Sequence, residues 1–471
     1  MSESSRPTVI ELAEAVRRGE TSAVEQTREA LARISADDAF NAFIAVDEDL
    51  ALASAAAVDA TIARGEDPGP LAGVPFGVKD LEDCAGFTTS HGSLLHRDDP
   101  PKRADSIHVG RLRAAGAIPL GKTAAPEFGT LNFTKTKAFG VTRSPWNPER
   151  TPGGSSGGSA AVVSAGIVPF ATASDGGGST RIPAGFTGLV GHKASYGRTP
   201  NPGPDGSLTA VTGALTTTVT DAARHLDVAT GPDDRDRHSL PLPGGSFESA
   251  VEQLDVTGLR ARWSTDMGFA TVHPEVADLA RGAAEQLIAA AALAGDEMPL
   301  HLTDPVRTWL SSGSLDLWFS VTAEEYRTRP DDLTAFSRFA MDTTVDRPAP
   351  KIARDQARRH QLSLDVAALF TEVDVLLTPT TAVPAFAAEG PPRATFDDEV
   401  VEGAMVTPFT MLANLCWNPS ISVPAGVTSD GLPVGLMITA ARHRDDVCLR
   451  LARILESAAP WPRFAPGVSA T

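Results

Sequence analysis

The sequence predicts an α/β protein whose β-sheet is covered by helices. Short apolar segments alternate with longer alanine-rich or amphipathic segments through much of the chain, which is typical of strands connected by helices. The chain has 471 residues, of which 42% are hydrophobic and 21% charged, so it is long enough and apolar enough to bury a large core. No internal repeat at about 20 to 50 residues is present, which argues against a repeat architecture.

The expected elements follow the chain in this order. In the first half, helices are predicted over 8–34 (two helices), 48–63, 106–115, from about 157, and 221–229, and strands over 40–46, 71–80, 117–121, 168–173 and 215–219. In the second half, strands are predicted over 259–264, 373–377, 420–425 and 434–438, and helices over 273–294, 362–370, 405–415 and 446–457. Residues 230–248 are rich in Pro, Asp and Gly and are expected to form a long surface connection. The span 297–400 is the least regular.

Composition excludes several classes of partner. The formal net charge of −18 argues against nucleic-acid binding, because a phosphate backbone needs a basic surface. No apolar run approaches the ~18 residues of a membrane span, and the polar, acidic N-terminus has no apolar signal core. The three cysteines, Cys84, Cys416 and Cys448, are far apart and form no CxxC pair, as expected of reduced thiols. We therefore expect a cytoplasmic protein that binds neither nucleic acid nor membrane.

Two serine-bearing glycine turns are the most unusual feature of the chain. The first is GGSSGGS at 153–159 and the second is DGGGSTR at 175–181, with Ser155 and Ser179 separated by 24 positions. Glycine loses more backbone entropy on folding than any other residue, so it concentrates where the chain turns unusually or approaches another group closely. The connecting segment 160–170 is apolar, which fits a flexible linker poorly. The turns are expected to form a reactive site.

Acyl transfer would use both a hydroxyl and a row of glycines. A serine hydroxyl attacks a carbonyl once a base takes its proton, and the oxyanion that forms needs N–H donors. The second turn offers Ser179 as nucleophile and the N–H groups of Gly176, Gly177 and Gly178 as donors. The first turn is expected at a helix N-terminus, where free N–H groups favour negative charge.

A histidine base has little support in the sequence. None of the ten histidines has neighbours that mark it, and His108, His192 and His225 are the nearest in sequence to the turns. The pattern GxSxG matches at 153–157, but the preceding 147–152 (NPERTP) is a poor strand, and a hydrolase elbow needs a strand leading into the serine.

A lysine can serve as the base instead. Burial disfavours the charged form of lysine and makes a neutral amine available. Lys79 closes the apolar segment 71–80, whereas Lys122 and Lys193 are alternatives that spacing alone does not exclude.

Three motifs in this order resemble the amidase signature family. They are GVPFGVKD at 73–80, GGSSGGSAA at 153–161 and DGGGSTRIPA at 175–184. The resemblance extends along most of the chain, through LGKT at 120–123, VTRSPWNP at 141–148, TPTT at 378–381 and GLPVGLMI at 431–438. It implies one large mixed, twisted β-sheet covered by helices on both faces.

The resemblance also implies a Ser-cisSer-Lys triad. Ser179 would be the nucleophile, Ser155 the bridging serine on a cis peptide bond, and Lys79 the base. Ser156 would support the network by hydrogen bonding, while Asp175 and Arg181 would hold the loop in shape. The reaction needs no organic cofactor and no metal ion.

The expected organisation is a single domain over 1–465 with a short tail over 466–471. Within it we expect an N-terminal helical part (1–65), a signature core (66–230), a variable substrate-recognition part (231–400) and a C-terminal part that returns to the core (401–465). Residues that could line the substrate pocket are Phe128, Asn132, Phe133, Trp318 and Trp417, and further apolar candidates are Phe139, Trp309, Phe319 and Met411.

The expected substrate is a small amide. No basic cluster marks a site for a substrate carboxylate, which favours an uncharged aryl or alkyl amide, an ester or a carbamate (urethane). One alternative is the glutaminase (A) subunit of a tRNA-dependent amidotransferase, and another is a catalytically inactive binding protein on the same fold. The chain would act as a monomer or homodimer.

Overall fold

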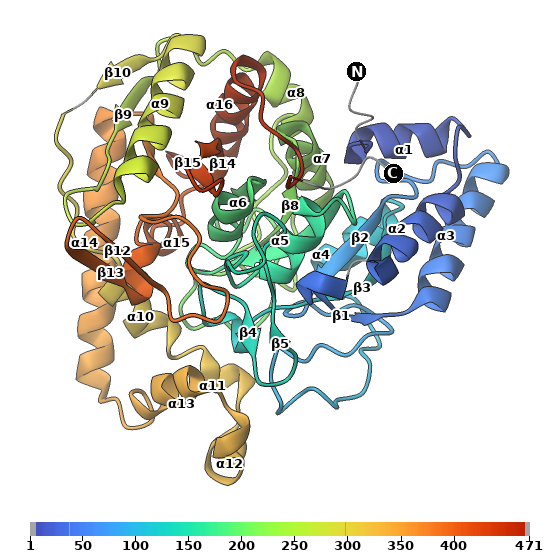
Figure 1. The fold of residues 1–471 in the computed structure, drawn as a ribbon, viewed down its shortest axis with the longest axis horizontal. Helices are drawn as coiled ribbons and strands as arrows, with labels where there is room; N and C mark the ends of the chain where they lie inside the picture. The colour runs from blue at the N-terminus through green and yellow to red at the C-terminus, as the bar shows by residue number, and fades with distance from the viewer. Residues whose placement is uncertain (1–5, 37, 297, 467–471) are drawn as a thin grey trace.

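The structure is a computed structural model that describes residues 6–36, 38–296 and 298–466. An 11-stranded sheet runs through it in the order β1-β3-β2-β6-β8-β7-β14-β15-β11-β9-β10 (Figure 1). These strands are β1 (Phe43–Val46), β2 (Pro75–Lys79), β3 (Ile118–Thr123), β6 (Phe170–Asp175), β7 (Val190–Lys193), β8 (Val211–Thr216), β9 (Arg260–Trp263), β10 (Ala294–Asp296), β11 (Val375–Pro379), β14 (Ser420–Val427) and β15 (Pro433–Ala440). Two small hairpins lie outside this sheet, β4 (Lys135–Thr136) with β5 (Gly140–Val141) and β12 (Arg393–Phe396) with β13 (Glu399–Glu402).

The sheet is mixed, as expected. Strand β2 runs parallel to both of its neighbours, β3 and β6, and β9 runs parallel to β10 and β11. The pairs between β6 and β11 are antiparallel. The C-terminal strands β14 and β15 therefore lie in the middle of the sheet, between β7 and β11.

Helices connect the strands. They are α1 (Val9–Arg17), α2 (Ala23–Ala36), α3 (Glu48–Ala63), α4 (Ile107–Ala114), α5 (Gly157–Ser164), α6 (Arg181–Thr187), α7 (Val219–Ala229), α8 (Phe247–Gln253), α9 (Pro274–Ala290), α10 (Val306–Gly313), α11 (Leu317–Ser320), α12 (Ala323–Thr328), α13 (Ala335–Asp342), α14 (Ala349–Glu372), α15 (Met411–Leu415) and α16 (Asp445–Ala458). Short 3-10 turns cover Asp38–Phe40, Glu127–Gly129, Pro330–Asp332 and Gly403–Val406. No helix within the described ranges is both long and apolar enough to cross a membrane.

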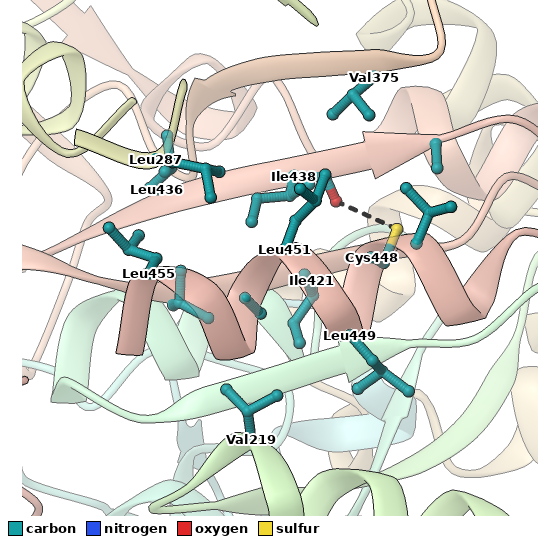
Figure 2. Packing of buried hydrophobic residues seen from close by; sticks show 14 of the residues in the cluster. Val219, Leu287, Val375, Ile421, Leu436, Ile438, Cys448, Leu449, Leu451 and Leu455 are labelled. Carbon is teal, nitrogen blue, oxygen red and sulfur yellow. Dashed lines mark hydrogen bonds between the residues drawn. The ribbon is translucent and has the colours of Figure 1, made fainter. Parts of the chain in front are cut away.

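Strand β15 shows that helices cover both faces of the sheet. Side chains alternate between the two faces of a strand. Leu436 and Ile438 pack with residues of α7, α9 and α16 in one core cluster (Figure 2). Met437, between them, belongs to a different cluster together with Ile182 of α6. Burying this apolar surface on both faces stabilises the sheet by roughly 25 cal/mol per Å².

The same alternation in β2 positions the lysine that ends it. Phe76 and Val78 are fully buried in a cluster with residues of α1 and α4. Lys79 is one position further along and therefore points to the opposite face. That is the face on which α5 begins, within the first glycine turn.

Three sequence expectations need correction. The strand expected over 215–219 ends at Thr216, because Thr218 caps α7 by accepting a hydrogen bond from the Asp221 N–H. The helix expected over 405–415 is divided into a 3-10 turn and α15, with Pro408 between them. The span 297–400 contains five α-helices, α10–α14, where little regularity was expected.

Candidate active site

The two glycine turns meet at one cavity of about 740 Å³. Ser155 of the first turn and Gly176, Gly177 and Ser179 of the second turn all line it. The first turn leads into the N-terminus of α5, and the second connects the end of β6 to α6. Both serines thus reach the same space from different elements.

Close backbone contacts explain the glycines of the first turn. A Cβ atom at Gly154 would lie 2.6 Å from both the Leu131 carbonyl oxygen and the Phe133 nitrogen. Any larger residue would therefore displace the neighbouring chain. The peptide bond between Gly154 and Ser155 is cis, as the resemblance implies.

Lys79 lies among serine hydroxyls. Its Nζ is 2.8 Å from Ser155 Oγ, 2.8 Å from Ser156 Oγ and 2.9 Å from Ser174 Oγ. The side chain is fully buried, and burial lowers the pKa of Lys79 to about 7, although the charges of Glu82 and Asp175 oppose the shift. A substantial fraction of neutral amine is therefore present near pH 7, and this amine can accept a proton from a hydroxyl.

A buried ion pair shapes the second turn. Asp175 accepts hydrogen bonds from Arg181 Nε and Nη2, both at 2.9 Å, and from the N–H groups of Gly178 and Thr180. Burial alone would raise the pKa of Asp175, but the Arg181 guanidinium and the Asn414 amide hold it at about 2. The carboxylate therefore stays ionised and ties both ends of the turn to the start of α6.

Some N–H groups of the second turn donate hydrogen bonds within the protein, whereas others have no protein acceptor among the described residues. The Gly178 N–H donates to Asp175 Oδ1 at 2.7 Å, so the expectation that Gly178 serves as an oxyanion donor is revised. In the part of the chain that the structure describes, the N–H groups of Gly176, Gly177 and Ser179 donate to no protein acceptor. These three remain available to a reacting oxygen.

The alternative histidine bases are bonded to other groups, although His108 also lines the cavity. His108 bonds to Glu82 Oε2 and to His225 Nε2, both at 2.7 Å. His192 Nε2 lies 3.6 Å from Asp445. None of the three histidines has a hydrogen bond to Ser155 or Ser179 among the described residues.

The two other buried lysines also bond elsewhere. Lys193 Nζ donates to the Ala194 carbonyl at 2.8 Å. Lys122 Nζ lies 3.6 Å from Asp80. Lys79 is thus the lysine that the fold brings to the two turns.

Of the five pocket residues expected first, Phe128 alone lines the cavity, and of the further candidates Trp309 and Phe319 line it. Phe133 is buried against Phe386 in the core, and Asn132 donates to Thr407 Oγ1. Trp318 packs against Tyr326, and Trp417 stacks on Tyr196 with ring centroids 4.7 Å apart. The three aromatic rings therefore pack against other protein groups, which is the usual environment of an aromatic side chain.

Three residues around the site were not anticipated, Ser174, Thr410 and Asn414, and Trp309 was expected only as an aromatic side chain of the pocket. Ser174 bonds to Lys79, and Asn414 Nδ2 bonds to Asp175. Trp309 Nε1 donates to the Gly176 carbonyl, and Thr410 Oγ1 donates to the Gly177 carbonyl. The sequence held one weak signal for Ser174: Thr172 and Ser174 are hydroxyl residues two positions apart, which places them on the same face of a strand, and in the structure both bond to Lys79. Thr410 and Asn414 come from distant segments, and no local sequence pattern marked them or the hydrogen bond that Trp309 makes to the second turn.

Comparison with known proteins agrees with this geometry. The family model described as Amidase matches residues 25–449. The putative amidase AmiA2 of Mycobacterium tuberculosis is 36% identical over 91% of this chain and 88% of its own length. The glutamyl-tRNA(Gln) amidotransferase (A) subunit of Salinispora tropica is 37% identical over 95% of this chain and 96% of its own length. The crystal structure of a bacterial aryl acylamidase of the amidase signature family superposes with a TM-score of 0.89 at 29% identity, covering 97% of this chain and 96% of that one.

Proposed function

The chain belongs to the amidase signature family and is an amidohydrolase, and from this premise we propose that it cleaves the C–N bond of a small, uncharged amide through an acyl-enzyme on Ser179. The observation that carries the proposal is the fully buried Lys79 amine, 2.8 Å from Ser155 Oγ, beside the cavity that Ser179 also lines. A neutral amine next to a hydroxyl is the chemical requirement for activating a serine.

The proposed reaction begins with proton transfer. Neutral Lys79 accepts a proton from Ser155, and Ser155 accepts one from Ser179. Ser179 Oγ then attacks the substrate carbonyl carbon, and the electron pair of the carbonyl moves to its oxygen. The N–H groups of Gly176, Gly177 and Ser179 stabilise this oxyanion, and each such donor contributes about 3–4 kcal/mol to the lowering of the barrier.

The intermediate collapses when the proton returns. The proton passes from Lys79 through Ser155 to the leaving nitrogen, the C–N bond breaks, and the amine departs. A water molecule then attacks the ester on Ser179, with Lys79 and Ser155 again taking its proton. The bond between Ser179 Oγ and the acyl carbon then breaks, the proton returns through Ser155 to Ser179 Oγ, and the acid is released from the free enzyme.

The charge and polarity of the cavity favour an uncharged substrate. No arginine is among its described lining residues, and Lys102, its one lysine, lies 3.4 Å from Asp83. A substrate carboxylate would thus find no free cation, and it would meet several acidic groups. The apolar lining residues include Phe128, Leu310, Phe319 and Phe336, which suit an aryl or alkyl group.

Esters and carbamates fit the same proposal. Their carbonyl carbon accepts the same attack, and an alkoxide leaves more readily than an amine. A panel of 4-nitrophenyl acetate, 4-nitroacetanilide and a phenyl carbamate would rank the three bond types. The proposal expects measurable turnover of the anilide.

A glutaminase subunit is the second candidate, because the Salinispora tropica amidotransferase protein is 37% identical to this chain. Glutamine carries an α-carboxylate, for which the described lining of the cavity offers no arginine. We therefore expect glutamine to be hydrolysed at least about a hundredfold more slowly than the anilide. Faster glutamine hydrolysis, with co-purification of a partner protein, would favour the glutaminase instead.

The nucleophile is tested with a fluorophosphonate. The wild-type protein should gain one phosphonyl adduct on Ser179, detected by mass spectrometry of the digested chain. Ser179→Ala should lose both the adduct and turnover, by a factor on the order of 10⁴ or more. Ser159→Ala is the matched control, since Ser159 bonds to Thr123 and Thr172 away from the cavity. Equal turnover of Ser179→Ala and wild type would refute the proposed function.

A further inference from the structure

The peptide group between Gly176 and Gly177 is oriented by a tryptophan of the variable part. Trp309 Nε1, on α10, donates to the Gly176 carbonyl oxygen at 2.7 Å. This peptide is trans, so its carbonyl and the following N–H point in opposite directions. The hydrogen bond from the indole therefore fixes the direction of the Gly177 N–H.

The next peptide group is held differently. Thr410 Oγ1 donates to the Gly177 carbonyl at 2.6 Å, and the Gly178 N–H donates to Asp175 at 2.7 Å. This group is thus fixed at both ends. The Gly176–Gly177 peptide has a protein partner only at its carbonyl, since the Gly177 N–H has no acceptor within the described ranges.

The indole and the glycine also fit each other sterically. A Cβ atom at Gly177 would lie 2.5 Å from the indole ring, so only glycine lets the ring approach this closely. Trp309 also lines the cavity together with Gly177 and Ser179. The ring therefore forms a wall of the cavity at the same place where its N–H holds the loop.

We propose that Trp309 is a positioning residue that directs the Gly177 N–H at the oxyanion formed on Ser179 attack. The inference rests on the proposed function and adds a role for the variable part of the chain. Helix α10 both shapes the substrate cavity and sets the geometry of the reacting loop. Changes in α10 would then alter the rate of the chemical step as well as substrate choice.

Trp309→Phe tests this role by removing the donor while keeping a ring. We expect kcat for 4-nitroacetanilide to fall about 10- to 100-fold, because a misdirected donor loses much of its effect on the transition state. KM should change by less than about threefold. The inhibition constant of phenylboronic acid, which forms a tetrahedral adduct with a serine, should rise by the same factor as kcat/KM falls.

Two further variants provide the comparison. Trp318→Phe is the matched control, since Trp318 Nε1 donates to Thr344 Oγ1 at 2.9 Å, outside the cavity lining, and it should leave kcat unchanged. Thr410→Val removes the hydrogen bond to a peptide that Asp175 also holds, so its effect on kcat should be smaller than that of Trp309→Phe.

The outcomes separate the two proposals. Equal kcat in Trp309→Phe and Trp318→Phe, or a change in KM alone, would overturn the role of Trp309 while Ser179→Ala remained inactive. A larger loss in Thr410→Val than in Trp309→Phe would also overturn it. Activity in Ser179→Ala would instead refute the underlying function. Thermal melting of each variant shows that the compared proteins are folded.

Discussion

Two neighbouring strands each bury a lysine, and the surroundings of the two amines differ. In the parallel pair β2 and β3, Val78 is paired with Lys122, and Lys79 is the next residue along β2. Both lysine side chains are 0% exposed. Lys122 donates to the Glu82 carbonyl oxygen and to Thr89 Oγ1 and lies 3.6 Å from the Asp80 carboxylate, whereas the nearest partners of Lys79 are three hydroxyls.

The difference shows how one kind of residue acquires two roles. Burial lowers the pKa of both amines. At Lys122 the neighbouring Asp80 carboxylate opposes this shift and stabilises the charged form of the amine. The hydroxyls around Lys79 can donate to or accept from its amine, so they tolerate either protonation state. A buried lysine beside a carboxylate is a structural ion pair, and one among hydroxyls is suited to exchange protons.

Among the changes that test the comparison of the two lysines, Lys79→Met should have the largest effect. Methionine has a similar length and leaves no buried charge, so the fold should persist. We expect kcat for 4-nitroacetanilide to fall by about 10³-fold or more, since a general base contributes about 10²–10⁴-fold. Steady-state kinetics and circular dichroism provide the measurement, and turnover within tenfold of wild type would contradict the proposed base.

Lys122→Met should show the opposite behaviour. It leaves the Asp80 carboxylate buried without its cation, and removing one partner of a buried pair costs about 3–5 kcal/mol of unfolding free energy. Activity per folded molecule should stay within a few-fold of wild type. Urea unfolding measures the loss, and the double variant Lys122→Met/Asp80→Asn should recover much of it. An unchanged stability of the single variant would mean that Asp80 is satisfied by Ser90 and Gly92 alone.

The sequence predicted the parts of this comparison that depend on local chemistry. The apolar segment that ends in Lys79 and the two glycine turns marked the site, because each has an unusual composition over a few residues. The sequence could not separate Lys79 from Lys122 without the family resemblance. The Asp80 contact of Lys122 depends on how two strands align, and no spacing encodes that alignment.

Contacts that join distant segments were missed for the same reason. Trp309 and Asn414 reach the second turn from positions more than 130 and 230 residues away in the chain. Phe133, Trp318 and Trp417 were wrong as pocket residues for a related reason: an aromatic side chain packs against other protein groups as readily as against a substrate, and Trp417 stacks on Tyr196 and does not line the cavity. Helix α14 was predicted in part, over 362–370, whereas α10–α13 were not anticipated, because each of them has only four to eight residues.

The smallest expected effect concerns Ser174, and it appears as a shift in pH dependence. Lys79 must be neutral to act as a base, so kcat/KM should fall as pH decreases through about 7, tenfold per pH unit. Ser174 Oγ accepts from the Lys79 amine at 2.9 Å, and an acceptor favours the charged form. Ser174→Ala should therefore lower the pKa of Lys79 and move the acidic limb of the pH profile to lower pH by about one unit.

Ser159→Ala is the control, because it removes a buried hydroxyl that does not touch Lys79 and should leave the acidic limb in place. A limb that moved upward in Ser174→Ala, or moved equally in both variants, would show that the hydroxyls around Lys79 do not set its protonation.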